Sequence, residues 1–132
     1  MEKIGINPPD LHPPANNAYS HAIRSGKLLF IAGQVSMDAQ GNVVGPNDIR
    51  AQTKQVFENL KTVLRASGAT FSNIVYWTAY MVDMKKNFAG YAEVRTQYLA
   101  AENPKPATAL VEVSGLSAPG LVFEIQAIAV LD

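Results

Sequence analysis

Four polar residues interrupt the apolar stretch that runs from Lys105 to Val130 near the end of the chain. They are a hydroxyl, two carboxylates and an amide, from Thr108, Glu112, Glu124 and Gln126. Acidic side chains are rare in apolar segments unless they have a partner or a task. A carboxylate in such a place can act as a general base, or hold a water molecule or an ammonium group. We therefore predict that these side chains line a pocket.

Glu124 is the carboxylate of most interest. In "LVFEIQAIAVL" the strand alternation turns Phe123 and Ile125 to one face, which can pack beneath helices. The other face consists of Val122, Glu124, Gln126, Ile128 and Val130. That face is too apolar for open solvent, which predicts a covering subunit. Glu124 is then either a solvated acid at the rim or a working carboxylate in a site between subunits.

Three further residues could take part in chemistry. His21 could move protons, because histidine is the side chain best suited to that task near neutral pH, although a lone histidine in a strand is more often structural. Tyr19 could form a pocket wall with a polar tip. Glu112 lies in "VEV", an ordinary strand pattern, and an exposed structural position is favoured for it. His12 and His21 lack metal-ligand spacing, so no metal site is predicted.

Composition narrows the possible classes of protein. The 132 residues suit one domain, residues 1–132, with one core. The absence of cysteine excludes a disulfide scaffold, a thiolate metal site and a cysteine nucleophile. The 11 basic and 11 acidic residues cancel, so bulk charge recruits neither nucleic acid nor an anionic membrane. No signal peptide or membrane span is evident, which predicts a cytoplasmic protein.

The pattern along the chain predicts one α+β domain. After a proline-rich lead-in, the expected elements are strands near 19–24 and 28–37, a helix at 48–67, a strand at 72–84, a helix from about 88, and two final strands joined by a turn at "SAPG". Asn47 or Asp48 can cap the first helix, and Gly68 can end it. Gly33 interrupts its strand, which indicates a bulge or a close backbone approach. We expect a mixed sheet with both helices on one face.

Four stretches of this sequence resemble the RidA/YjgF family, whose name stands for reactive intermediate deaminase. They are "YSHAIRSGKLLFIAGQVSMDAQGNVV", "DIRAQTKQVFENLKTVLRASGAT", "KPATALVEV" and "VFEIQAIAV". The resemblance implies a chorismate-mutase-like α+β fold and a homotrimer with clefts between neighbouring subunits. It also implies hydrolysis of imines and enamines released by pyridoxal-phosphate enzymes, giving a keto acid and ammonia, with no metal or cofactor.

Several site positions carry over from this resemblance. Tyr19 matches the pocket tyrosine of the family, and Gly33 matches the glycine whose backbone lies near the substrate. Glu124 matches the acid thought to hold the attacking water. Thr108 stands where active members have an arginine that clamps the substrate carboxylate. The other departures are Ala32, Ala92 and Leu110, where the family often has a small hydroxyl residue, an asparagine and a cysteine.

A threonine cannot replace that arginine, because a hydroxyl offers one neutral hydrogen bond where a guanidinium offers a charged fork. We predict an arginine-lacking branch with little 2-imino-acid deaminase activity. Its members would hydrolyse an imine, an enamine or a related C–N bond of a small metabolite. Glu124 would be catalytic, with Tyr19, His21, Gly33 and Thr108 binding substrate. The alternative is a non-catalytic trimer that binds a metabolite or a protein. Zero net charge and the lack of a basic stripe disfavour a ribonuclease.

Overall fold

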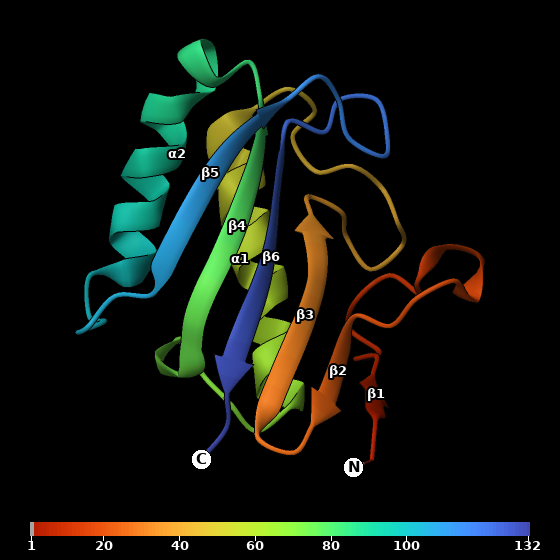
Figure 1. Cartoon of the computed structure of the whole chain (residues 1–132). Helices are drawn as coiled ribbons and strands as arrows, with labels where there is room; N and C mark the ends of the chain where they lie inside the picture. Colours follow the sequence, from red (N-terminus) through yellow and green to blue (C-terminus); the bar gives the residue numbers. More distant parts are fainter. Residues whose placement is uncertain (1) are drawn as a thin grey trace.

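Two long helices lie on one face of a six-stranded sheet in the computed structural model, which describes residues 2–132 (Figure 1). The strands are β1 (Ile4–Ile6), β2 (Ala22–Ser25), β3 (Leu28–Val35), β4 (Ile74–Val82), β5 (Ala107–Val113) and β6 (Phe123–Val130). Their order across the sheet is β1-β2-β3-β6-β4-β5. Only β4 and β5 are parallel; the other neighbours are antiparallel. The predicted mixed sheet with both helices on one face is confirmed.

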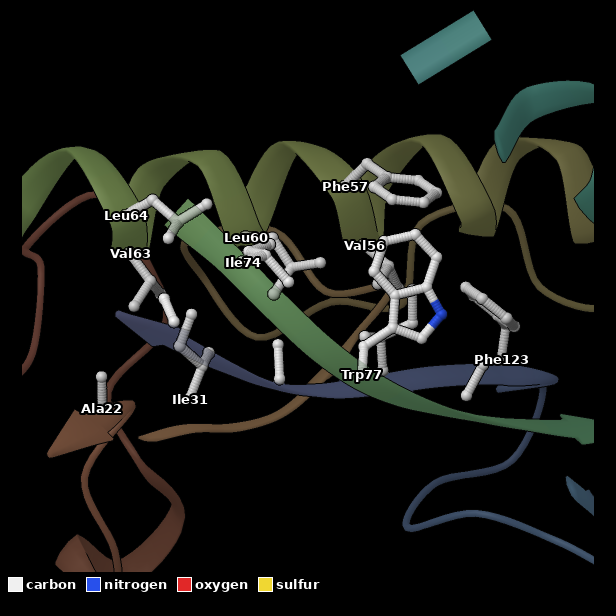
Figure 2. Packing of buried hydrophobic residues seen from close by; sticks show 14 of the residues in the cluster. Ala22, Ile31, Val56, Phe57, Leu60, Val63, Leu64, Ile74, Trp77 and Phe123 are labelled. Carbon is white, nitrogen blue, oxygen red and sulfur yellow. The ribbon is translucent and has the colours of Figure 1, made fainter. Parts of the chain in front are cut away.

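The helix α1 (Ile49–Ala66) matches the predicted helix closely. Asp48 caps its start, because its side chain accepts a hydrogen bond from the Ala51 N–H at 3.1 Å. Gly68 follows its end with φ +73°, a left-handed conformation that glycine adopts readily. The buried side of α1 faces the sheet (Figure 2). It includes Val56, Phe57, Leu60, Val63 and Leu64.

The helix α2 (Met84–Leu99) begins four residues before Phe88, the residue at which the apolar pattern predicts its start. Two carboxylates explain the earlier start: Asp83 accepts from the Lys86 N–H at 3.4 Å, and Glu112 of β5 accepts from the Met84 N–H at 2.9 Å. No helix within residues 2–132 has the length and apolar character that crossing a membrane requires. Short 3-10 helices, η1 (Ala15–Asn17) and η2 (Phe71–Asn73), complete the helical elements of that range.

The core lies between the helices and the sheet. Trp77 of β4 is fully buried there, with its ring centroid 5.6 Å from that of Phe57 in α1 (Figure 2). Phe123 and Ile125 of β6 are also fully buried, as the alternation predicts. Val122 was expected on the opposite face, but it is buried within the chain. The strand alternation does not reach Val122, because β6 begins one residue later.

The last two strands are not a hairpin, contrary to the prediction of two strands joined by a short turn. In the sheet β4 lies between β5 and β6, so the segment 114–122 crosses from one side of β4 to the other (Figure 1). The strand β5 follows β4 through α2 and pairs with it in parallel, as such a helical crossover allows. The strand β1 was not predicted; its three residues are too few to give a periodic signal.

Candidate functional site

The strand β3 bulges at Ala32 and Gly33. Ile31 pairs with Ala127 of β6, and Gln34 pairs with Ile125, so two residues of β3 lie opposite one residue of β6. The predicted interruption at Gly33 is therefore confirmed as a β-bulge. Such bulges re-aim side chains and often lie beside functional sites. Ala32 and Gly33 both lie on the sheet face that neither α1 nor α2 covers, which we call the open face (Figure 1).

The Glu124 side chain lies directly against Gly33. A Cβ built on Gly33 would clash with Glu124 Oε2 and would lie 2.7 Å from Glu124 Cδ, so only glycine leaves room for this carboxylate. Glu124 is half-buried, and burial raises the pKa of its carboxyl above the usual value. Within residues 2–132 it has no hydrogen-bond or ion-pair partner. A carboxylate of this kind can accept a proton more readily than a solvated one.

Tyr80 is a site neighbour that the sequence analysis missed. It lies directly opposite Glu124 on β4, on the same face of the sheet, and is half-buried. Alternation in "YWTAYMV" does turn Tyr76, Thr78 and Tyr80 to one face. What the sequence could not supply was the register between β4 and β6, which makes Tyr80 the neighbour of Glu124.

A hollow of about 380 Å³ opens on the same face, beside the bulge. It is lined by Ser20, Ile23, Phe30, Ile31, Ala32, Tyr76, Thr78, Gln126, Ala127 and Ile128. The walls are mostly apolar, with hydroxyl groups from Ser20 and Thr78 and an amide from Gln126. Ala32 and Gln126 connect this open-face hollow with the contact between Gly33 and Glu124. Its volume suits a small metabolite.

His21 is linked to the bulge through the side chain of Gln34. Its Nε2 lies 2.8 Å from the His12 carbonyl oxygen, which can only accept, so Nε2 is the donor. Its Nδ1 therefore accepts a hydrogen bond from the Gln34 amide, at 3.2 Å. The same amide donates to the Ala32 carbonyl at 3.2 Å. Burial lowers the pKa of the His21 imidazole, while the hydrogen bond to His12 opposes that shift. Both ring nitrogens are engaged, so a direct contact between His21 and a substrate remains a prediction that this geometry does not favour.

Tyr19 lies next to this histidine. Its ring meets the ring of His21 edge to face, with centroids 6.0 Å apart, and the residue is 43% exposed. Tyr19 is not among the residues that line the open-face hollow. Its exposure leaves it available to a ligand or to a second chain, as its predicted role in substrate binding requires.

Thr108 and Glu112 lie on the opposite face from Glu124. They pair with Trp77 and Met81 of β4, which are both buried beneath the helices. Thr108 is exposed at the edge of the sheet, and Glu112 holds the start of α2. The sequence predicted that the four polar residues of the C-terminal stretch line one pocket. A single chain does not bring them together. A site that contains both Thr108 and Glu124 requires two chains.

The open face also exposes large apolar side chains. Five of them are between 38% and 45% exposed: Leu28, Phe30, Tyr76, Val111 and Val130. Strand register puts them on the same face as Glu124. Apolar groups gathered in this way usually mark an interaction surface.

The chain is thus an α+β protein whose sheet carries a bulge, with an acidic side chain packed against it. The family model described as Endoribonuclease L-PSP matches residues 10–131. A RutC family protein of Pyrococcus horikoshii is 41% identical over 117 residues, which cover 89% of this chain and 90% of that protein. These matches show that the chain belongs to the RidA/YjgF family.

Two further relatives bear on fold and function. The 2-iminobutanoate/2-iminopropanoate deaminase of Rattus norvegicus is 32% identical over 118 residues, covering 89% of this chain and 83% of that protein. The crystal structure of E. coli TdcF with bound serine superposes with a TM-score of 0.87 at 25% identity, covering 98% of this chain and 99% of the other. The predicted chorismate-mutase-like fold, which the family shares, is confirmed.

Proposed function

We propose that this protein hydrolyses an imine, an enamine or a related C–N bond of a small metabolite. The observation that carries the proposal is the half-buried Glu124 carboxylate, held over Gly33 at the β3 bulge without a partner in residues 2–132. Perturbed carboxylates beside a cavity are frequent catalytic bases. The similarity to a rat protein named as an imine deaminase supports the same class of reaction.

The reaction needs one water molecule and one group that takes its proton. In the proposed step Glu124 holds the water and accepts a proton as the oxygen attacks the carbon of the C=N bond. The nitrogen takes that proton from Glu124 as the C–N bond of the tetrahedral intermediate breaks. The hydroxyl of the intermediate gives its proton to the leaving nitrogen, and a carbonyl product and ammonia leave. Glu124 returns its proton in the second half, so the enzyme ends unchanged.

We propose that the working site lies between two subunits of a homotrimer. Thr108 and Glu124 lie on opposite faces of one chain, so a neighbouring chain would have to bring its Thr108 to the open face. The exposed apolar side chains of that face give a second chain a surface to cover. Tyr19 and Gly33 would then contact the substrate from the first chain, and Thr108 from the second.

Turnover of 2-imino acids should be weak. An arginine–carboxylate pair makes charge-assisted hydrogen bonds of about 1.5–3 kcal/mol, against about 1 kcal/mol for a neutral bond such as Thr108 can donate. Affinity for a substrate carboxylate should therefore be lower than in relatives with arginine by a factor of about ten or more.

The alternative function is a non-catalytic trimer that binds a metabolite or a protein in the same clefts. Thr108 favours this alternative, because a protein without the arginine that binds the substrate carboxylate can also have lost the hydrolytic activity. Cleavage of RNA, which the description of the family model suggests, is disfavoured, because the net charge is zero and the sequence has no basic stripe to attract phosphates.

Ammonia release separates these functions. Imines would be generated in situ by an amino-acid oxidase or an amine oxidase. The rate of ammonia release above that of spontaneous hydrolysis would then be compared for wild type and Glu124→Gln. If the wild type hydrolyses an imine and Glu124→Gln does so at least about tenfold more slowly, the protein is an enzyme. Ligand binding without any acceleration supports the binding trimer.

A further inference from the structure

Charge is almost absent from the strands, and its placement is asymmetric. The strands contain three charged residues, Arg24, Glu112 and Glu124. Arg24 and Glu112 pair with Leu29 and Met81, which are buried on the helix side, so both belong to that side of the sheet. Glu124 is consequently the only charged strand residue on the open face within residues 2–132.

Within residues 2–132, the Glu124 carboxylate has no positive partner. No ion pair or hydrogen bond to it occurs within residues 2–132, and burial disfavours its charged form. A half-buried carboxylate without a partner gains most from a bound cation, because the cation restores the interactions that burial removed. The same carboxylate repels an anion. The electrostatics of the site therefore distinguish ligands by charge.

Most cations of the chain itself lie away from Glu124. Of the 11 lysines and arginines, seven lie in the helices α1 and α2, on the side of the sheet away from Glu124. The other four are Lys3, Arg24, Lys27 and Lys105. Lys105 lies closest in sequence to Thr108, and its Nζ already donates to the Glu102 carbonyl at 2.8 Å. Thr108 itself brings a hydroxyl in place of the arginine that the family resemblance leads one to expect.

We infer that this site takes small cationic nitrogen compounds, namely iminium or ammonium ions that carry no carboxylate. The inference rests on the proposed function and names its substrate class. The protonated nitrogen would lie against Glu124, and a short hydrocarbon chain would occupy the open-face hollow between Phe30 and Ile128. Ser20, Thr78 and Gln126 offer neutral hydrogen bonds there, and none of them can clamp a carboxylate as a cation would.

The balanced reaction is R–CH=NH₂⁺ + H₂O → R–CHO + NH₄⁺. Protonation makes the carbon electrophilic before water attacks it. Glu124 takes a proton from the attacking water as the C–O bond forms, and gives that proton to the nitrogen as the C–N bond breaks. The hydroxyl of the intermediate gives its remaining proton to the leaving ammonia, which yields R–CHO and NH₄⁺. No oxidant, reductant or other co-reactant enters.

A matched set of stable probes tests the charge preference. Pyrrolidine is a cation at neutral pH, cyclopentanecarboxylate is an anion of the same ring size, and proline carries both charges. We expect calorimetry to show pyrrolidine binding at least about tenfold more tightly than cyclopentanecarboxylate. Glu124→Gln should remove this difference. Glu112→Gln, the same change on the helix side, should leave it intact.

A second pair tests turnover. Propan-1-imine, made from propylamine by an amine oxidase, differs from 2-iminobutanoate only in lacking the carboxylate. We expect kcat/KM to be at least about tenfold higher for propan-1-imine. Higher kcat/KM for 2-iminobutanoate, tighter binding of cyclopentanecarboxylate, or no binding of pyrrolidine would each overturn the inference. Pyrrolidine binding through Glu124 with neither imine hydrolysed would uphold the charge preference and refute the proposed hydrolysis.

Discussion

The carboxylate of Glu124 lies against the backbone of Gly33, where β3 carries one residue more than β6 can pair. The contact exists because position 33 has no side chain. It gives Glu124 a half-buried place on a face whose strands carry no other charge, and burial raises the pKa of its carboxyl. The proposed chemistry depends on this one contact between two neighbouring strands.

Gly33→Ala should displace the Glu124 carboxylate, because the new Cβ would overlap Oε2. We expect activity or cation binding to fall by at least about tenfold, the typical minimum for losing a general base. Gly115→Ala is the matched control, since a Cβ there meets nothing within 4 Å. Unchanged activity in Gly33→Ala, measured beside that control, would contradict the assigned contact.

Acidification should destabilise the protein through His21. Because burial holds its pKa in the folded state below the unfolded value of about 6.5, the unfolded chain binds the extra proton first. The free energy of unfolding should fall as pH drops below about 6.5, by at most about 1.4 kcal/mol per pH unit from this group. Urea titrations across pH 5–8 should show this component in wild type and in His12→Gln. If His21→Gln loses as much unfolding free energy on acidification as the wild type does, His21 is not the source of that loss.

Thr108→Arg should raise the hydrolysis of 2-iminobutanoate. Thr108 is exposed at the edge of the sheet, so an arginine fits there without disturbing the core. The guanidinium would supply the carboxylate clamp and also a cation near Glu124 in the assembled site. Steady-state kinetics should show a lower KM for 2-iminobutanoate and weaker binding of pyrrolidine. If neither changes, Thr108 does not reach the site.

The protein should be a homotrimer held through the open face. Sedimentation equilibrium at micromolar concentration should give three times the 14.2 kDa mass of one chain. Phe30→Asp should dissociate it, because a charge would enter the covered apolar surface. Phe88→Asp on α2 is the matched control, since Phe30 and Phe88 are 45% and 43% exposed in one chain. A monomeric wild type, or equal dissociation by both variants, would refute this interface.

Local signals made most of the fold predictable from sequence. The apolar spacing of α1, the Asp48 cap and the glycine after its end are local, and so is the alternation that buries Phe123 and Ile125 in β6. The pairing of strands is not local. Nothing within the last two strands says that β4 lies between them, so the predicted hairpin was wrong.

The candidate site was predictable only in part, for the same reason. Gly33 interrupts its strand visibly, and Glu124 stands out as an acid in an apolar strand. Tyr80 becomes a neighbour of Glu124 only through the register of β4 and β6. Gln34 becomes a support for the bulge only through its bond to His21. These relationships join residues far apart in sequence, which no periodic pattern reports.

The most direct test of the account is the rate of ammonia release from propan-1-imine by wild type and Glu124→Gln at neutral pH, with Glu112→Gln as control. The Gln variant keeps the shape of the side chain and removes the buried charge, so it should stay folded with an equal or higher melting temperature. We predict acceleration by wild type and by the control, and a loss of at least about tenfold in Glu124→Gln. Equal rates for wild type and a folded Glu124→Gln would contradict the central claim.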